Sequence, residues 1–256
     1  MSQPLLEVRG VSIRFGGVEA LKKVSMSVHA GEVVALCGDN GAGKSTLIKI
    51  ISGVYQPDEG QVFFDGEPLD IRDPQDARAK GIETIYQDLA LADNLDVGSN
   101  IFLGREPVTR RFGFNVIDRP RMAGVAQDVL DQLDIVIPAR KIHGPVKMLS
   151  GGQRQAIAIG RAIYWNARVL IMDEPTAALG VPEQRKVMEL IVSLKKEGVA
   201  VILISHNLHD IFSVSDRIFV LRRGEAVGER RVSEVDGDAV VKMMVGDEYA
   251  ATRAVA

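Results

Sequence analysis

The sequence predicts an α/β protein built around a mainly parallel β-sheet. Three apolar runs, at residues 81–87, 169–173 and 199–205, are separated by longer segments of helical periodicity. This alternation favours crossover connections between parallel strands. Each run ends in polar residues, and an earlier apolar run ends at Gly38. Four strands would therefore present polar groups at their carboxyl ends, the edge at which open α/β sheets bind ligands.

The N-terminal part of the chain is expected to form a small β-rich segment that precedes the α/β core. Residues 5–15, 18–28 and 32–37 have the composition of short strands separated by glycine-rich turns. A helix with a broad buried face is predicted over 46–52, and Gly53 would end it.

The segment from 88 to 155 is expected to form a helical subdomain inserted into the α/β core. Its pattern is helical and irregular, with a polar, arginine-rich patch at 109–111 and helical periodicity from Met122 to Leu133. A single domain would cover residues 5–246. The small, polar tail at 247–256 is expected to be mobile.

Composition and charge exclude several classes of protein. The 256 residues are 46% hydrophobic and 25% charged, and the net charge of -3 gives no general attraction to nucleic acid. The single cysteine, Cys37, rules out an internal disulfide and a cysteine-rich zinc site. The apolar runs are far shorter than the roughly 18 residues of a membrane-spanning helix, and the first residues lack a signal-peptide pattern. We therefore expect the protein to stay in the reducing cytoplasm.

Gly38 opens a segment that fits the P-loop pattern G-x-x-x-x-G-K-[ST], with a strand before it and a helix after it. Glycines let successive backbone N–H groups turn towards phosphates, and the helix points its positive N-terminus at the same charge. We expect Lys44 to hold the β and γ phosphates and Ser45 to bind Mg²⁺. A glycine-rich turn with a solvated lysine is the alternative. The residues of this nucleotide-binding segment are Gly38, Asp39, Asn40, Gly41, Ala42, Gly43, Lys44, Ser45 and Thr46.

The apolar run at 169–173 ends in two adjacent acids, Asp173 and Glu174. Beside a P-loop, one carboxylate can hold Mg²⁺ through water and the other can orient an attacking water. A strand that ends in Asp-Glu is by itself usually just a turn. The functional interpretation therefore depends on the P-loop.

Residues 149–153, Leu-Ser-Gly-Gly-Gln, predict the start of a helix. Ser150 and Gln153 have the spacing of a capping box ahead of periodic apolar residues. Gly151 and Gly152 would occupy the first turn, where each costs up to about 1 kcal/mol relative to alanine. Either the helix end tolerates these glycines, or they leave a second exposed N-terminus on which another phosphate can rest.

Together these segments resemble the ATP-binding cassette (ABC) ATPases over nearly the whole chain. The resemblance implies a P-loop NTPase core of the ABC type, with an N-terminal antiparallel β subdomain and an inserted α-helical subdomain. It also implies hydrolysis of ATP with Mg²⁺. The matching features occur in the order of that family and at about its intervals, and they are the P-loop at Gly38, Gln87, Leu149–Gln153, Asp173-Glu174 and His206.

The resemblance also implies roles that spacing alone does not assign. Phe15 matches the aromatic residue that stacks on adenine, and Gln87 matches the residue that ligates Mg²⁺ and senses a membrane partner. Glu174 corresponds to the catalytic base, and His206 to the switch histidine that contacts the γ phosphate. With Lys44, these two complete the expected catalytic set. The expected metal ligands are Ser45, Gln87 and Asp173.

In this family two cassettes pack head to tail, and the Ser-Gly-Gly segment of one closes over the nucleotide of the other. The residues contributed in this way would be Ser150, Gly151, Gly152 and Gln153. Because the chain has one cassette, its partner would be a second copy or a related chain, and a homodimer is expected. The family usually has an aspartate where this chain has Gly180. The effect of Gly180 on coupling between the two cassettes is left open.

Segments 40–43, 86–89 and especially 100–106 resemble cassettes of bacterial importers for monosaccharides of the ribose, xylose and fructose type. The resemblance implies a peripheral ATPase subunit on the cytoplasmic side of the cell membrane. Its partners would be an integral membrane permease and, through the permease, an extracellular or periplasmic solute-binding protein, with no nucleic acid. A branched-chain amino-acid importer is one alternative, and a non-transport ABC ATPase that acts on a soluble partner is another.

Overall fold

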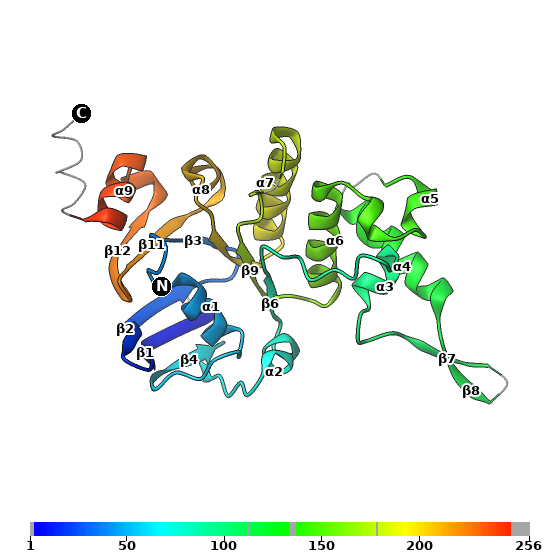
Figure 1. Cartoon of the computed structure of the whole chain (residues 1–256), viewed down its shortest axis with the longest axis horizontal. Coiled ribbons are helices and arrows are strands. Elements are labelled where there is room, and N and C mark those ends of the chain that lie inside the picture. The colour runs from blue at the N-terminus through cyan, green and yellow to red at the C-terminus, as the bar shows by residue number, and fades with distance from the viewer. Residues whose placement is uncertain (1–2, 112, 134–136, 178, 247–256) are drawn as a thin grey trace. The chain divides into compact units, whose positions relative to one another are not determined.

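The structure is a computed structural model that describes residues 3–111, 113–133, 137–177 and 179–246 (Figure 1). The tail at 247–256, which the sequence predicts to be mobile, lies outside the described residues. The chain divides into two compact units. Among the described residues, the first comprises 3–84, 168–174 and 191–246, and the second comprises those of 85–167 and 175–190. The second unit thus contains the predicted insertion at 88–155 together with a further segment.

A six-stranded sheet forms the centre of the first unit. Its order is β12-β11-β3-β10-β9-β6, and β3, β9, β10 and β11 pair in parallel, whereas β12 runs antiparallel to β11. The predicted α/β class with a mainly parallel sheet is confirmed. The strands are β3 (Val33–Cys37), β6 (Ile82–Ile85), β9 (Val169–Asp173), β10 (Ala200–Ile204), β11 (Arg217–Arg222) and β12 (Glu225–Arg231).

The central strands of this sheet are apolar because both of their faces are covered. Every residue of β3 and β10 is buried, which is typical of parallel strands inside an α/β protein. Cys37 ends β3 with its side chain enclosed, and this burial raises the pKa of the thiol to about 12. The cysteine is therefore a buried apolar residue of the core, as its place in an apolar run predicts.

The second sheet of the first unit is antiparallel and has the order β2-β1-β4-β5. The sequence predicts its first two strands at nearly the observed positions. The strands are β1 (Leu6–Phe15), β2 (Val18–Val28), β4 (Glu59–Phe64) and β5 (Glu67–Pro68). The helices that belong wholly to this unit are α1 (Lys44–Ile51), α2 (Pro74–Ala79), α8 (Leu208–Val214) and α9 (Gly237–Val245), and a short 3-10 helix covers Val232–Glu234.

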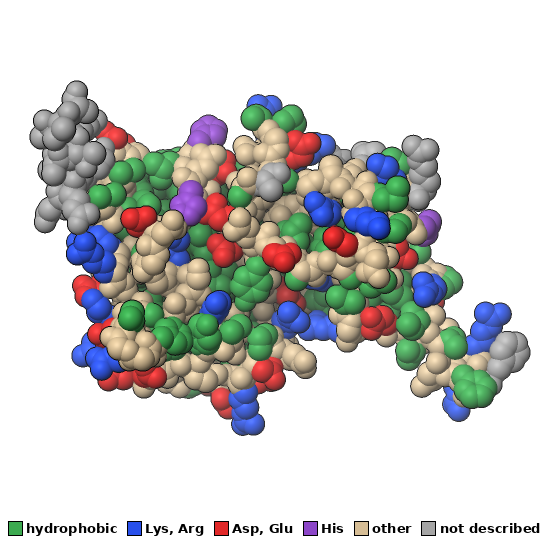
Figure 2. Space-filling model, in the orientation of Figure 1, with side chains coloured by type: hydrophobic (Ala, Val, Ile, Leu, Met, Phe, Trp, Pro, Cys, Tyr) green, Lys and Arg blue, Asp and Glu red, His purple; other side chains and the backbone are tan. Residues whose placement is uncertain are grey.

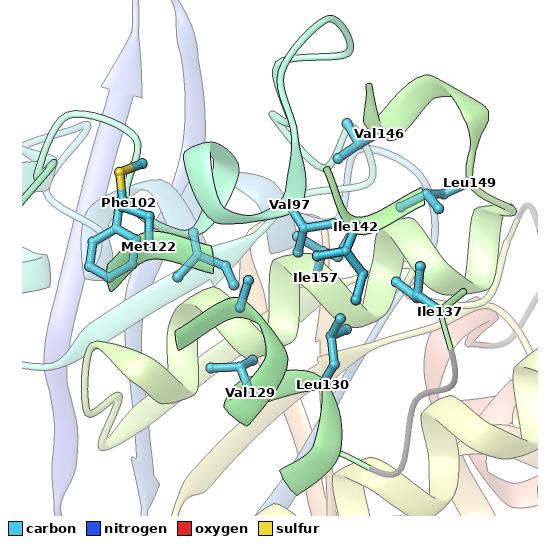
Figure 3. Close-up of a cluster of buried hydrophobic side chains, with 12 residues drawn as sticks. Val97, Phe102, Met122, Val129, Leu130, Ile137, Ile142, Val146, Leu149 and Ile157 are labelled. Carbon is cyan, nitrogen blue, oxygen red and sulfur yellow. The ribbon is translucent and has the colours of Figure 1, made fainter. Parts of the chain in front are cut away.

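The second unit is helical around a core of its own. Figure 3 shows this core, in which the side chains of α3, α4 and α6 meet. Its largest enclosed residue is Phe102, and Ile157 contributes from the middle of α6. The helices are α3 (Val97–Ile101), α4 (Arg119–Gln132), α5 (Ala139–Ile142), the 3-10 helix Val146–Met148, α6 (Gly151–Tyr164) and the first part of α7 (Val181–Lys196).

A β-hairpin interrupts the segment that the sequence predicts to be helical and irregular. Its strands are β7 (Val108–Arg111) and β8 (Phe114–Ile117), and Gly113 lies in the turn with φ +85°. The arginine-rich patch at 109–111 is therefore part of a strand. The missed signal is a glycine between two short runs rich in β-branched residues, which is typical of a hairpin.

Across the described residues, no helix is both long enough and apolar enough to cross a membrane.

Candidate functional site

The P-loop lies between β3 and α1 of the first unit. Gly43 is the N-cap of α1 with φ 107° and provides no side-chain hydrogen bond to the helix. The first-turn N–H groups of α1 thus have no side-chain cap, as an anion site requires. The Nζ of Lys44 donates to the carbonyl oxygens of Gly38 at 2.6 Å and Asp39 at 3.1 Å. The ammonium group therefore lies across the loop that the sequence predicts to hold phosphate.

Two of the loop glycines are required by close contacts. A Cβ at Gly38 would lie 2.3 Å from the carbonyl oxygen of Leu221, a backbone atom of β11. A Cβ at Gly43 would lie 2.7 Å from the Leu21 side chain and 2.8 Å from the Ala20 carbonyl oxygen. Because neighbouring backbone leaves no room, these positions exclude every other residue type.

The two acids predicted from the sequence lie at the carboxyl end of β9. Asp173 is the last residue of the strand and pairs with Ile204 of β10. Glu174 follows with φ 52°, a left-handed conformation that is strained for a residue with a side chain. Its N–H donates to the Ile204 carbonyl oxygen at 2.9 Å, and this bond holds the turn against β10.

The turn brings Glu174 to His206, which follows β10. The Nε2 of His206 lies 3.3 Å from the Oε1 of Glu174, and the side chains are 57% and 14% exposed, respectively. The same Oε1 atom is enclosed and has no hydrogen-bond partner that meets normal geometry. The carboxylate therefore retains an acceptor that a water molecule or a ligand could use.

Burial raises the pKa values of both acids above their ordinary range. For Asp173, the positive charges of Lys44 and His206 oppose this rise. For Glu174, His206 is the largest opposing influence, whereas the neighbouring Asp173 raises the pKa further. Two carboxyl groups and two cationic groups from three separate segments of the first unit are thus close enough to affect one another's charge.

The loop that carries His206 is fixed by its own hydrogen bonds. The N–H of Asn207 donates to the Ser205 Oγ at 3.0 Å, and the Asn207 side chain caps α8 by accepting from the N–H of His209 at 3.0 Å. The imidazole of His206 therefore extends from a rigid turn between β10 and α8.

Phe15 lies at the end of β1 with 45% of its surface exposed. The structure adds an aromatic partner that sequence reasoning missed. The rings of Phe15 and Tyr55 pack edge to face with 5.1 Å between their centroids, and the Nζ of Lys49 lies 5.3 Å from the Tyr55 centroid. The Arg14 N–H donates to the Asp58 carboxylate at 2.8 Å and joins this loop to β1. Nothing in the local sequence around Tyr55 predicts the pairing, because it arises from tertiary contact.

The helix predicted to start at Ser150 is α6 of the second unit. Both arms of the capping box are present: the Gln153 N–H donates to the Ser150 Oγ at 3.3 Å, and the Ser150 N–H donates to the Gln153 Oε1 at 3.1 Å. Ser150 is exposed at this helix end. A Cβ at Gly152 would lie 2.7 Å from the Glu183 Cγ, which explains the second glycine.

Gln87 and Gly180 also belong to the second unit, and both are exposed. Gln87 follows β6, as the sequence predicts. The Gln184 N–H donates to the Gly180 carbonyl oxygen at 2.9 Å, so the first turn of α7 closes on Gly180. A Cβ at Gly180 would lie 2.9 Å from the Glu183 Oε2. The Glu183 carboxylate thus already occupies the space beside Gly180, the position at which ABC ATPases usually have an aspartate.

The oxygen donors of the first unit suit magnesium. The expected ligands there, the Ser45 hydroxyl and the Asp173 carboxylate, are the hard oxygen groups that Mg²⁺ prefers. In the described part of the chain, no cluster of three or more His, Cys, Asp or Glu residues could hold a metal by itself. This donor set fits an ion that takes most of its ligands from water and phosphate, as Mg²⁺ does in nucleotide sites.

The fold and these residues define a nucleotide-binding α/β protein of the P-loop class, and comparison with known proteins places it within that class. The family model described as ABC transporter matches residues 21–177. The chain belongs to this family and is an ATP-binding ATPase of the ABC type.

Several curated proteins resemble the chain closely. The xylose/arabinose import ATP-binding protein XylG of Sulfolobus acidocaldarius is 49% identical over 94% of this chain and 93% of its own length. The fructose import ATP-binding protein FrcA of Rhizobium meliloti is 45% identical over 87% of the chain and 86% of its own length. The ribose import ATP-binding protein RbsA 1 of Rubrobacter xylanophilus is 48% identical over 95% of the chain. The match covers 47% of that longer protein, so the chain spans about half of it.

Solved structures share the fold. One is MJ1267, an ATP-binding cassette of an ABC transporter, in its ADP conformation. The match covers 96% of this chain and 100% of MJ1267, at 25% identity and a TM-score of 0.79. Another is the ATP-binding cassette MJ0796, solved as a dimer in a post-hydrolysis state with ADP and Pi. The match covers 89% of this chain and 98% of MJ0796, at 26% identity and a TM-score of 0.73.

Proposed function

We propose that this chain is the ATP-hydrolysing subunit of an importer that energises the uptake of a monosaccharide through a membrane permease. The observation that carries the proposal is the 49% identity to a xylose/arabinose import ATP-binding protein along almost the full length of both chains. Fructose and ribose import proteins are nearly as similar. A pentose or hexose is therefore the best-supported class of cargo.

The P-loop binds the triphosphate in this proposal. The ammonium group of Lys44 exchanges its two carbonyl acceptors for oxygens of the β and γ phosphates. The uncapped N–H groups of α1 point at the same charge. Ser45 and Asp173 would hold Mg²⁺, with Gln87 as the further ligand that the family resemblance implies, and a bound ion would offset negative charge on the phosphates. Phe15 stacks on the adenine.

Glu174 is the general base. Its carboxylate lies beside His206 at the end of β9, and its raised pKa brings its proton affinity closer to neutrality, where a base is most effective. It accepts a proton from the attacking water, and the γ phosphorus–oxygen bond to ADP breaks as the bond to water forms. Lys44 and His206 stabilise charge on the transferred phosphoryl group.

A second copy of the chain completes the site. The N-terminus of α6, with Ser150, Gly151, Gly152 and Gln153, supplies polar groups, among them the Gly151 and Gly152 N–H groups that the capping box does not use, to the nucleotide held by the P-loop of the other copy. ATP binding then closes the pair and hydrolysis reopens it. The permease, sensed through Gln87, converts this motion into a change of access. The subunit lies at the cytoplasmic face of the membrane, and an extracellular or periplasmic solute-binding protein delivers the sugar to the permease.

The test is reconstitution of the chain in proteoliposomes with the integral membrane protein and the solute-binding protein that copurify with it. ATP hydrolysis should be stimulated by xylose, arabinose, fructose or ribose, and the same sugar should accumulate inside the vesicles. The Glu174→Gln chain is the control for uptake that does not depend on hydrolysis. Stimulation by leucine and by none of the sugars would contradict the cargo class. Copurification with soluble proteins alone would contradict transport.

A further inference from the structure

The hairpin β7–β8 is a prominent surface of the second unit that the proposed mechanism does not use. It forms a two-stranded sheet of its own, and all eight strand residues are exposed. Figure 1 shows it extending beyond the end of α4 as a separate arm. The residues that face one another across the strands are Val108 and Ile117, Thr109 and Val116, Arg110 and Asn115, and Arg111 and Phe114.

The base of the hairpin is fixed to the core of its unit. The Asp118 N–H donates to the Pro107 carbonyl oxygen at 2.8 Å and closes the strands at their base. The guanidinium of Arg105 lies 4.7 Å from the Trp165 ring centroid, and the Trp165 Nε1 donates to the Ile101 carbonyl oxygen at 3.0 Å. These contacts fix the base of the hairpin, while its two strands protrude from the unit.

Large apolar side chains are exposed on both faces of the arm. Phe114 is 74% exposed, Val108 60%, Ile117 49% and Val116 39%. Because side chains alternate along a strand, Val108 and Ile117 lie on one face and Val116 and Phe114 on the other. An isolated two-stranded sheet is at best marginally stable in water. Large apolar side chains that are exposed on both faces of one protruding element are typical of a contact region.

The same arm is basic in a chain that is acidic overall. Residues 108–117 contain two arginines and no acid, whereas the whole chain has a net charge of -3. Arg110 and Arg111 are both exposed on β7. In Figure 2, basic and hydrophobic side chains cover the projecting arm together. Its partner should therefore offer negative charge and an apolar layer close to one another.

We propose that the β7–β8 hairpin contacts the surface of an anionic lipid bilayer. Arg110 and Arg111 would lie against headgroup phosphates, while Phe114 and its apolar neighbours enter the boundary between headgroups and acyl chains. A nucleic acid would satisfy the arginines but would leave the aliphatic side chains in water. A membrane is also the setting in which an ATPase of the ABC transporter family works.

Co-sedimentation of the full chain with lipid vesicles tests the proposal without a permease. The chain should bind vesicles that contain phosphatidylglycerol more tightly than vesicles of phosphatidylcholine alone, and added salt should weaken the binding. The double variant Arg110→Glu, Arg111→Glu should lose at least roughly 30-fold in affinity, since each basic residue contributes about fivefold. The control is Arg72→Glu, Lys80→Glu, which changes the charge equally at exposed positions of the first unit.

Phe114 tests insertion separately from charge. Phe114→Trp should retain affinity, and the emission of the new indole should shift to the blue with anionic vesicles only. Phe114→Ser should bind more weakly, with unchanged thermal stability and ATP hydrolysis. The proposal is overturned if the wild-type chain does not sediment with anionic vesicles, or if the charge-reversed and control variants bind alike. It is also overturned if the hairpin variants weaken copurification with the permease while binding to protein-free vesicles is unchanged, because the arm would then contact protein.

Discussion

His206 and Glu174 approach within 3.3 Å although 31 residues separate them in the chain. The contact exists because β9 and β10 are parallel neighbours whose carboxyl ends coincide, with Asp173 beside Ile204. An exposed imidazole and an enclosed carboxylate thus meet at the edge of the sheet that also carries the P-loop.

Replacement of Glu174 by Gln should reduce the steady-state rate of ATP hydrolysis by roughly 10²- to 10⁴-fold, because the amide cannot accept the proton of the attacking water. ATP binding should remain, and the variant should form a dimer that ATP stabilises. Phosphate release and size-exclusion chromatography with ATP measure the two effects. Hydrolysis near the wild-type rate would require another base.

The pH dependence of hydrolysis should report the pKa of Glu174. Burial raises this pKa, so the rate should fall on the acidic side at a higher pH than an ordinary glutamate would give. His206 lowers the same pKa, and His206→Gln should therefore move the acidic limb to still higher pH. The measurement is kcat/KM against pH, taken on the residual rate. His209→Gln, at an exposed histidine of α8, should leave the limb in place, and an unmoved limb in His206→Gln would refute the coupling.

Mixed dimers should show that two chains share each site. Lys44→Ala should weaken ATP binding by roughly 10- to 100-fold, because it removes charge-assisted hydrogen bonds to the phosphates. Ser150→Arg should block the end of α6. Either variant alone should be inactive, whereas a mixture should recover hydrolysis through the mixed dimer that retains one intact composite site. Failure to recover activity, with mixed dimers detected by mass, would contradict shared sites.

The aromatic contact of Phe15 should hold its ring ready for adenine. Phe15→Ala and Tyr55→Leu should each raise the KM for ATP with little change in kcat, and Tyr55→Phe should behave as wild type. The double variant should cost less than the sum of the single variants by about 0.5–1.5 kcal/mol, the usual coupling of an aromatic pair. If Phe15→Ala raises KM and Tyr55→Leu does not, the base stacks on Phe15 without support from Tyr55.

An aspartate at position 180 should conflict with Glu183. The Cβ of Gly180→Asp would lie 2.9 Å from the Glu183 Oε2, so two carboxylates would share the first turn of α7. Thermal unfolding should show that Gly180→Asp is stabilising only when combined with Glu183→Gln, with a coupling of roughly 0.5 kcal/mol. The coupling should vanish at acidic pH, where both carboxyl groups are neutral. A coupling that persists in acid, or one that is absent at neutral pH, would contradict a charge conflict.

Local features of the site could be predicted from the sequence. The P-loop is defined by consecutive residues and by the strand and helix on either side, and β3 and α1 are found where those flanks predict them. The capping box at Ser150 and Gln153 is likewise a local hydrogen-bond pattern, and both of its bonds are present. Such signals are reliable because their partners are only a few residues apart.

Features that depend on distant contacts could not be predicted. The ring of Tyr55 meets Phe15 across 40 residues, and the strained φ of Glu174 is imposed by the bond from its N–H to Ile204. The hairpin β7–β8 is missed for a different reason, because its two strands are close in sequence. The arginines at 110 and 111 indicate an irregular polar segment, whereas the β-branched residues at the two outer ends of the hairpin and the glycine at 113 favour two paired strands.

The burial of Cys37 makes the chain a convenient host for site-specific labels. Maleimides and related reagents react with thiolates, and a thiol whose pKa is about 12 offers almost none at neutral pH. Since Cys37 is the single cysteine of the sequence, the unmodified protein should not react with such reagents. A cysteine introduced at an exposed position would then carry the only fluorophore or spin label, so that distances between paired subunits could be followed through the ATP cycle.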